Sequence, residues 1–177
     1  MRAAIIYHSE SGRTRAVAEA TAARCGADCI RVYPRPAYTA LTRFLFGPRR
    51  AVFGHHDRIT PAPIDVSAYD TIVIGSPVWA GHPTPPVVSA IESLQGCRGK
   101  EAVLFITCCV TPGVALERMS AMIEGMGMTV RGGMVFPGRS IRDPIQLDAL
   151  AALVAQKSGE IEPEVQTSHG PSGVEEG

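Results

Sequence analysis

Short apolar runs alternate along most of this chain with segments in which apolar residues recur at helical spacing. In each short run, residues pointing to both faces are apolar, which is typical of strands buried between two layers. The expected strands cover residues 2–8, 28–33, 70–76, 101–107 and 128–136.

The segments between these strands place apolar residues three and four positions apart, the period of an amphipathic helix. Gly26 and Gly96 stand where helix C-caps are expected. The expected helices cover residues 14–25, 85–94, 114–126 and 144–156. Strands that alternate with helices predict a parallel sheet with right-handed crossovers, so we expect an α/β fold with three layers, α/β/α.

One connection, residues 34–64 between the second and third strands, is longer than a single crossover helix requires. It holds five Arg, at positions 35, 43, 49, 50 and 58, with Asp57 as its acidic residue before Asp65. Apolar residues from Leu41 to Phe53 predict an amphipathic helix interrupted at Gly47 and Pro48. This helix either covers a sheet edge or forms a surface for a substrate or partner.

The last segment, residues 157–177, has five Glu, one Lys and almost no large apolar side chain. Such a composition cannot bury enough surface to order the segment by itself. We therefore expect one domain over residues 1–156, followed by an acidic, flexible tail.

Composition narrows the class of protein. The chain has 177 residues with 17 basic and 17 acidic side chains, and it lacks the positive excess of a nucleic-acid binder. Its five cysteines contain no C-x-x-C pair, which argues against a disulfide framework and a zinc site and favours the reducing cytoplasm. The start MRAAIIYH lacks the apolar core of a signal peptide, and no window approaches the ~20 apolar residues of a membrane span.

Three hydroxyls and a glycine lie between the first strand and the first helix, in the sequence SESGRT (Ser9–Thr14, the first loop). The first turn of a helix directs backbone N–H groups at such a loop, so an anion is a natural ligand. Neither the P-loop pattern with its lysine nor G-x-G-x-x-G is present, which disfavours nucleoside triphosphate chemistry. The alternative is that Ser11 simply caps the helix.

Two further loops follow the third and fourth strands: GSPVWAGHPTPPV (Gly75–Val87, the second loop) and TCCVTPG (Thr107–Gly113, the third loop). In a doubly wound sheet of order 2-1-3-4-5, ligands bind at the carboxyl ends of the strands, beside the first and third. The sequence here resembles the flavodoxin-like family over roughly residues 1–136. The first loop is similar to that family's [ST]-x-[ST]-G-x-[ST] loop for the phosphate of FMN, and Pro77–Gly81 is similar to the P-[IV]-W-x-G segment of its flavodoxin-like oxidoreductases.

The resemblance implies a five-stranded sheet of order 2-1-3-4-5 and an FMN site with no catalytic side chain and no metal. It assigns the phosphate to the first loop, the isoalloxazine ring to part of the second, and the pyrimidine side of the ring to part of the third. The implied cofactor-binding residues are Ser9, Glu10, Ser11, Gly12, Arg13, Thr14, Pro77, Val78, Trp79, Ala80, Gly81, Thr107, Cys108 and Cys109. The adjacent cysteines depart from the family, which often has a glycine or another small residue there.

Three functions remain open. The first is an FMN-dependent oxidoreductase that passes electrons from NAD(P)H to a quinone or similar small acceptor, and the others are an electron carrier for a redox protein and a flavin-free interaction module. Because the tail's charge is −4 and the whole chain is neutral, residues 1–156 carry +4, which favours the enzyme over the typically acidic carriers of the family. Cys108 and Cys109 are a redox pair, a source of a thiolate nucleophile, or simply small buried side chains. The apolar surface of Phe44, Phe46 and Phe53 predicts a homodimer.

Overall fold

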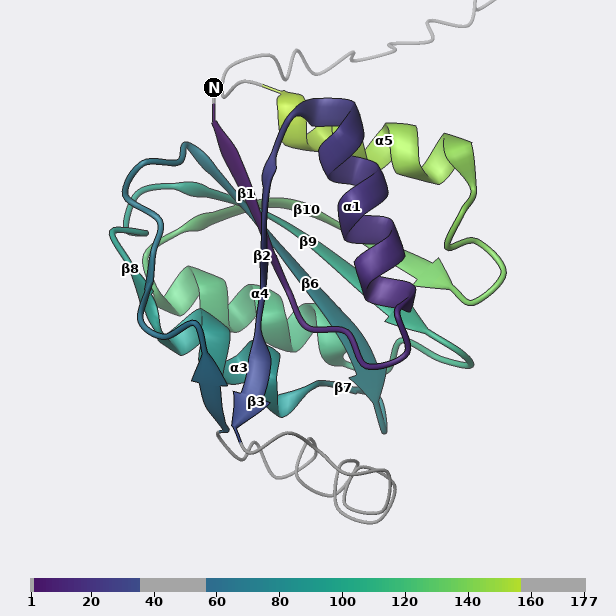
Figure 1. The fold of residues 1–177 in the computed structure, drawn as a ribbon, viewed down its shortest axis with the longest axis horizontal. Coiled ribbons are helices and arrows are strands. Elements are labelled where there is room, and N and C mark those ends of the chain that lie inside the picture. Colours follow the sequence, from purple (N-terminus) through teal and green to yellow (C-terminus); the bar gives the residue numbers. More distant parts are fainter. Residues whose placement is uncertain (1, 36–56, 157–177) are drawn as a thin grey trace, which may run out of the picture.

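The computed structural model describes residues 2–35 and 57–156, which form a parallel sheet between two layers of helices (Figure 1). The sheet order is β10-β9-β6-β1-β2, and all neighbours in this order are parallel. The strands are β1 (Ala3–Tyr7), β2 (Asp28–Arg31), β6 (Thr71–Trp79), β9 (Glu101–Cys108) and β10 (Thr129–Pro137). In chain order this arrangement is 2-1-3-4-5, so the predicted fold class and strand order are confirmed.

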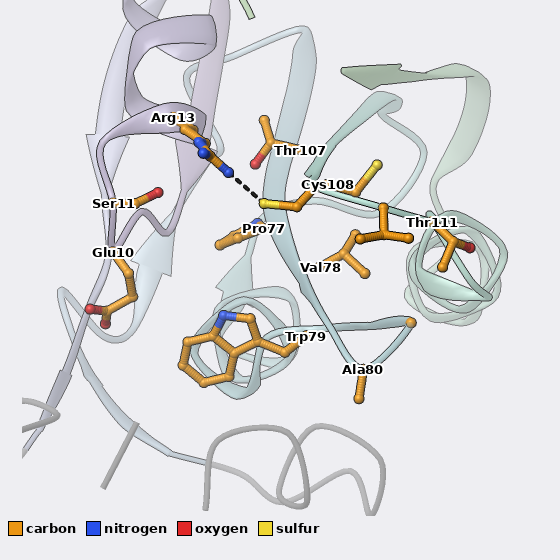
Figure 2. A pocket seen from close by; sticks show the side chains of 13 residues that line it. Glu10, Ser11, Arg13, Pro77, Val78, Trp79, Ala80, Thr107, Cys108 and Thr111 are labelled. Atoms are coloured by element: carbon orange, nitrogen blue, oxygen red, sulfur yellow. Dashed lines mark hydrogen bonds between the residues drawn. The ribbon is translucent and has the colours of Figure 1, made fainter. Parts of the chain in front are cut away.

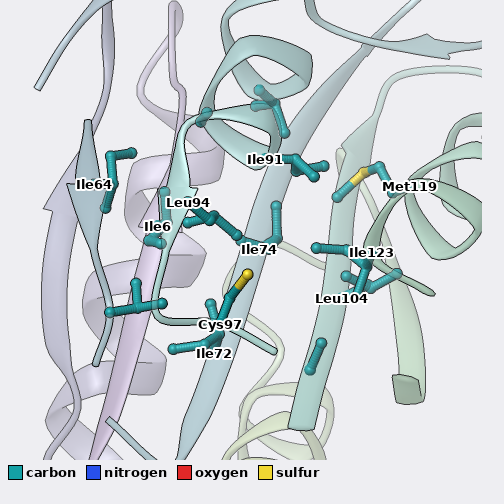
Figure 3. Close-up of a cluster of buried hydrophobic side chains, with 14 of the residues drawn as sticks. Ile6, Ile64, Ile72, Ile74, Ile91, Leu94, Cys97, Leu104, Met119 and Ile123 are labelled. Carbon is teal, nitrogen blue, oxygen red and sulfur yellow. The ribbon is translucent and has the colours of Figure 1, made fainter. Parts of the chain in front are cut away.

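Side chains alternate between the two faces of the sheet and build a separate hydrophobic core on each. One core joins Ile6, Ile74 and Leu104 to α3 (Pro85–Glu92) and α4 (Ala115–Gly125), as Figure 3 shows. The other joins alternate strand residues, including Val73 and Phe105, to α1 (Arg13–Cys25) and α5 (Pro144–Ala155). Because both faces of the sheet are covered, the three central strands β1, β6 and β9 are largely buried and mostly apolar, as the sequence pattern predicts, whereas the edge strand β2 is partly exposed.

Glycine is required at one central position of the sheet. A Cβ on Gly75 of β6 would lie 2.2 Å from the ring of Phe105 on β9. The ring of Phe105 in turn meets Phe136 of β10 edge-on, with centroids 6.2 Å apart. The ring of Phe105 therefore fills the space that a side chain at position 75 would occupy, and it packs the sheet near the carboxyl ends of its strands.

Several predicted boundaries were wrong. The strand expected at 28–33 ends at Arg31, and a separate strand β3 (Tyr33–Arg35) pairs antiparallel with β4 (Arg58–Thr60). Gly96 has a positive φ of 70° but is not a helix cap, because α3 ends at Glu92 and a short strand β8 (Leu94–Gln95) pairs with β5 (Ile64–Asp65) before it. Gly26 is the C-cap of α1, as predicted.

The ends of the long connection are thus strands rather than a helix crossover. β3 and β4 form a two-stranded sheet of their own, so both ends of the connection contribute to strands. The amphipathic helix predicted between Leu41 and Phe53 lies outside the described residues, as does the acidic tail from residue 157.

Candidate functional site

The three loops singled out in the sequence meet at one edge of the sheet, around a cavity of about 560 Å³ (Figure 2). They follow β1, β6 and β9, neighbouring strands whose carboxyl ends lie together because the sheet is parallel. All the predicted site residues except Ser9, Gly12 and Thr14 line this cavity. Val110 and Thr111 of the third loop also line it, although the resemblance assigned them no role.

The first loop leads into α1 without a side-chain cap from Ser11. The N-cap residue is Gly12, with φ 85°, and it makes no side-chain cap bond, so the interpretation of Ser11 as a simple cap is wrong. Instead the buried Ser9 Oγ accepts a hydrogen bond from Arg15 N at 3.2 Å. The exposed Ser11 hydroxyl lies free of the helix and lines the cavity.

Arg31 of β2 holds the main chain of the first loop in place. Its Nη2 donates a 2.7 Å hydrogen bond to the carbonyl oxygen of Ser9, and its guanidinium lies 4.7 Å from the centre of the Tyr33 ring. This contact fixes the main chain of the loop and places a cation beside it. The Arg31 guanidinium and the N–H groups in the first turn of α1 both contribute positive potential at the loop.

A buried hydrogen bond joins the first loop to the third. Thr14 Oγ1 and Thr107 Oγ1 lie 2.9 Å apart, and both side chains are buried. Each hydroxyl has one proton, so only one of the two donates in this bond and the other keeps its proton for a further acceptor. The pair therefore fixes the distance between the two loops while leaving one hydroxyl proton available.

Arg13 crosses the cavity from the first loop to the third. Its Nη1 donates to the exposed Cys109 Sγ at 2.5 Å, the bond drawn in Figure 2. Burial raises the pKa of the neighbouring Cys108 thiol, and electrostatic repulsion between the two adjacent cysteines raises it further. Cys108 is accordingly a neutral thiol at neutral pH, and all five cysteines are free.

The second loop is largely a hairpin, which the sequence did not indicate. β6 continues through Trp79, turns at Ala80 and Gly81, and pairs antiparallel with β7 (His82–Pro83). Both turn residues have positive φ, 49° for Ala80 and 79° for Gly81, as a two-residue type I′ turn requires. Pro77, Val78 and Trp79 therefore form a strand end that borders the cavity rather than an irregular loop.

The hairpin is fixed in place by backbone contacts with the third loop and its helix. Val114 N donates to Gly81 O at 2.8 Å, and a Cβ on Gly113 would lie 2.3 Å from Gly81 Cα. At the base of the hairpin, Ser76 Oγ accepts from Thr84 N at 3.1 Å. The wall of the cavity formed by the hairpin thus depends on two glycines that meet without side chains.

His8, which the sequence analysis missed, lies buried behind the cavity. Its Nδ1 is 3.2 Å from Val32 O, and because a carbonyl only accepts, this nitrogen carries a proton. Its Nε2 lies 3.2 Å from Glu10 Oε1, at ion-pair distance but without good hydrogen-bond geometry. The ring meets Trp79 edge-on with centroids 6.5 Å apart. His8 therefore contacts both Glu10 and Trp79 from a buried position that does not line the cavity.

The other histidines do not form a metal centre in the described residues, where no group of three potential ligands occurs. His82 Nδ1 lies 3.3 Å from Arg118 Nη1 of α4, so an unprotonated Nδ1 accepts from the guanidinium. His55 and His56 lie outside the described residues.

No helix among the described residues is long and apolar enough to cross a membrane.

Comparison with known proteins identifies the fold. No protein family and no curated protein matches the sequence. A provisionally named flavoprotein of Bacteroides eggerthii is similar in structure, with a TM-score of 0.72 and 21% identity, covering 88% of this chain and 99% of its own. A flavoprotein of Lactobacillus acidophilus, solved in complex with FMN, has a TM-score of 0.60 and 22% identity, covering 85% and 98%.

A flavodoxin of Megasphaera elsdenii, solved in its two-electron reduced form, is similar as well. Its TM-score is 0.55 at 18% identity, and the match covers 86% of this chain and 98% of the flavodoxin. The chain therefore has a flavodoxin-like fold, which confirms the fold expected from the three loops.

Proposed function

We propose that this chain is a flavoprotein that binds FMN, with its phosphate at the first loop and its isoalloxazine ring between the second and third loops. The observation that carries the proposal is the convergence of these three loops on one cavity of about 560 Å³. A volume of this size suits a cofactor, since small-molecule sites measure roughly 300–1,000 Å³. The FMN complex of the Lactobacillus acidophilus flavoprotein, which shares the fold, supports the same ligand.

The chemistry of the lining residues fits FMN. The first loop offers the Ser11 hydroxyl, the Arg13 guanidinium and main-chain N–H groups at the start of a 13-residue helix, which suit a phosphate dianion without a metal. A Cβ on Gly12 would meet nothing within 4 Å, so a ligand can approach the main chain closely there. Trp79, Pro77 and Val78 offer apolar surface on the side where a ring would lie.

We further propose that the protein is an oxidoreductase that passes electrons from NAD(P)H to a quinone or a similar small acceptor. When bound, FMN supplies the electron-transfer chemistry, since flavins accept hydride. The chain's own residues bind and orient the ring, and Trp79, backed by His8, limits the access of water from that side. The +4 charge of residues 1–156 supports an anionic donor or acceptor in preference to a basic protein partner.

A spectrum and a titration test these proposals in turn. Purified protein should be yellow or should bind added FMN with quenching of Trp79, the single tryptophan. Trp79→Phe should weaken FMN and riboflavin by a similar factor, because the contact is with the ring. No flavin binding by the intact chain would contradict the flavoprotein.

The enzymatic part is tested separately. The FMN-loaded protein should oxidise NADPH under nitrogen when a quinone is supplied. A loaded protein that is inert to both NADH and NADPH would favour the electron carrier for a redox protein. The homodimer remains a proposal, since Phe44, Phe46 and Phe53 lie outside the described residues, and a solution mass measurement tests it.

A further inference from the structure

A second cavity, of about 380 Å³, shares the first loop with the cavity described above. It is formed by the start of α1 and by the segment that connects β10 to α5. The lining residues are Ser11, Gly12, Arg13, Ala16, Gly138, Arg139, Ile141 and Arg142. Because Ser11 and Arg13 line both cavities, a single ligand can reach from one to the other.

Arg13 stands between the two cavities. Its Nη1 donates to Cys109 Sγ on the side of the first cavity. The same Nη1 lies 4.0 Å from the position that a Cβ on Gly138 would take, and Gly138 lines the second cavity. The boundary at this point is therefore a long side chain, which a ligand can displace or bind.

The second cavity is strongly basic. Arg139 and Arg142 are exposed and form no ion pair within residues 2–35 and 57–156, and none of the lining residues is acidic. By contrast, Arg15 and Arg24 on α1 are paired with Glu19 and Asp148 at 2.7 and 2.6 Å. Guanidiniums that line one cavity and have no acidic partner among the described residues favour an anion, and the planar guanidinium matches phosphate oxygens in pairs.

The segment that carries these two arginines is held in shape before any ligand binds. Ser140 N donates to Pro137 O at 2.8 Å, and Asp143 N donates to Ser140 O at 3.1 Å, so two turns follow each other. Ile141, between the arginines, is buried in the core beneath α1 and α5. Asp143 Oδ1 accepts from Ile145 N at 3.0 Å and caps α5 instead of neutralising an arginine.

We propose that the second cavity binds a second phosphate-bearing group, next to the one held by the first loop. The monoester phosphate of FMN uses the donors of the first loop, which leaves Arg139 and Arg142 for another anion. The ligand that carries a flavin and a further phosphate in one molecule is FAD, whose AMP half would extend from the first loop into the second cavity. The inference rests on the proposed flavin site, and the same phosphate chemistry could be supplied by NADPH.

The test compares three flavins that differ by one group at a time. Riboflavin lacks a phosphate, FMN carries a monoester phosphate, and FAD carries a diphosphate joined to adenosine. The change that a variant of the second cavity makes in the ratio of FMN to FAD affinity therefore reports on that cavity. Titrations of the full chain should show FAD binding more tightly than FMN. In Arg139→Gln/Arg142→Gln the Kd for FAD should rise about ten-fold or more, with riboflavin unchanged and FMN within about two-fold.

A matched control removes the same charge elsewhere. Arg15→Gln/Arg24→Gln changes two arginines of α1 that line neither cavity, and it should leave all three Kd values within about two-fold. Because Arg139 and Arg142 are exposed, their double variant should unfold at the same denaturant concentration as the wild type.

The outcomes separate the possible sources of the phosphate. A selective loss of FAD affinity supports the AMP half of FAD, and a rise in KM for NADPH but not for NADH, with flavin affinities unchanged, supports the phosphate of the donor. An equal loss for FMN and FAD, or no change in any ligand, overturns the proposal. A wild-type chain that binds no flavin overturns the proposed function as well, so the two failures are distinguishable.

Discussion

The first loop and the hairpin that carries Trp79 border the same cavity, yet they are held in place differently. The first loop consists of consecutive residues, and its shape follows from Gly12 in the left-handed region and the start of α1. The position of the hairpin depends on residues more than thirty positions away, since Gly81 packs on Gly113 and its carbonyl accepts from Val114. The first loop therefore combines local backbone geometry with single hydrogen bonds from Arg31 and Thr107, whereas the hairpin depends on the close packing of one backbone segment on another.

This difference predicts where a substitution is tolerated. A change in the first loop should alter the group that it contacts and little else. A change at the packed glycines should move the whole hairpin. It should lower the free energy of unfolding and weaken the binding of every ligand that has a flavin ring.

The largest effect is expected from Gly113→Ala. The new Cβ would lie 2.3 Å from Gly81 Cα, where backbone atoms cannot give way easily, and φ is already positive at 53°. The free energy of unfolding should fall by roughly 2–4 kcal/mol. Riboflavin and FMN should lose affinity by a similar factor, since the ring side is displaced, and denaturant unfolding and flavin titration measure both.

Gly12→Ala is the matched control for this prediction. Its φ is also positive, at 85°, but a Cβ would meet nothing within 4 Å. The expected cost is about 1 kcal/mol, and FMN should weaken relative to riboflavin because only the first loop changes. If Gly12→Ala were as destabilising as Gly113→Ala, the first loop would also depend on tertiary packing and the comparison would fail.

The same difference explains how much of the site could be predicted from the sequence. The strand order and the first loop follow from local patterns: apolar runs, helical periods and a hydroxyl-rich turn before a helix. The hairpin was missed because Pro77, Ala80 and Gly81 are typical of an irregular loop, and only the pairing of Trp79 with His82 makes the segment a strand end. His8 was missed because a lone histidine after a strand carries no signal until Val32 and Trp79 surround it.

The pairing of β3 with β4, at the two ends of the connection 34–64, could not be predicted from the sequence for a similar reason. Tyr33–Arg35 and Arg58–Thr60 are each three residues long, too short for a periodic pattern, and they are more than twenty residues apart. Two of the three arginines that line the second cavity, Arg139 and Arg142, were also missed. Arg139 and Arg142 belong to no recognisable motif. They line a cavity only because the segment before α5 lies beside the start of α1 in the fold.

An intermediate effect is expected from the hydroxyl pair that connects the first loop to the third. Thr107→Val removes one partner and leaves the buried Thr14 hydroxyl without its hydrogen bond, at a cost of about 1–3 kcal/mol in the free energy of unfolding. Thr14→Val/Thr107→Val replaces both partners with groups of similar shape, so its cost should be well below the sum of the single variants. A double-mutant cycle by denaturant unfolding measures the coupling.

Flavin titration of the same variants assigns the remaining proton. If Thr14 donates to the phosphate, Thr14→Val should raise the Kd for FMN about ten-fold while riboflavin changes little. A lower stability with an unchanged ratio of FMN to riboflavin affinity would show that the pair only joins the two loops. The first loop would then bind phosphate through Ser11, Arg13 and main-chain groups.

The smallest effect is expected at the thiol that Arg13 contacts. Cys109 is exposed, whereas Cys108 is buried with a raised pKa, so iodoacetamide near neutral pH should alkylate Cys109 well before Cys108. Because Cys109 lines the cavity, saturating FMN should slow its labelling. Cys29 is exposed on β2, and burial raises the pKa of its thiol, so it should react slowly but at the same rate with and without FMN and can serve as the unprotected reference in the same mass spectrum. Cys109→Ser should change the free energy of unfolding by less than about 0.5 kcal/mol and leave flavin reduction by NADPH intact, since the hydroxyl can still accept from Arg13. Loss of flavin reduction in Cys109→Ser with FMN still bound would instead assign this thiol a part in the chemistry, and the third loop would then do more than border the ring.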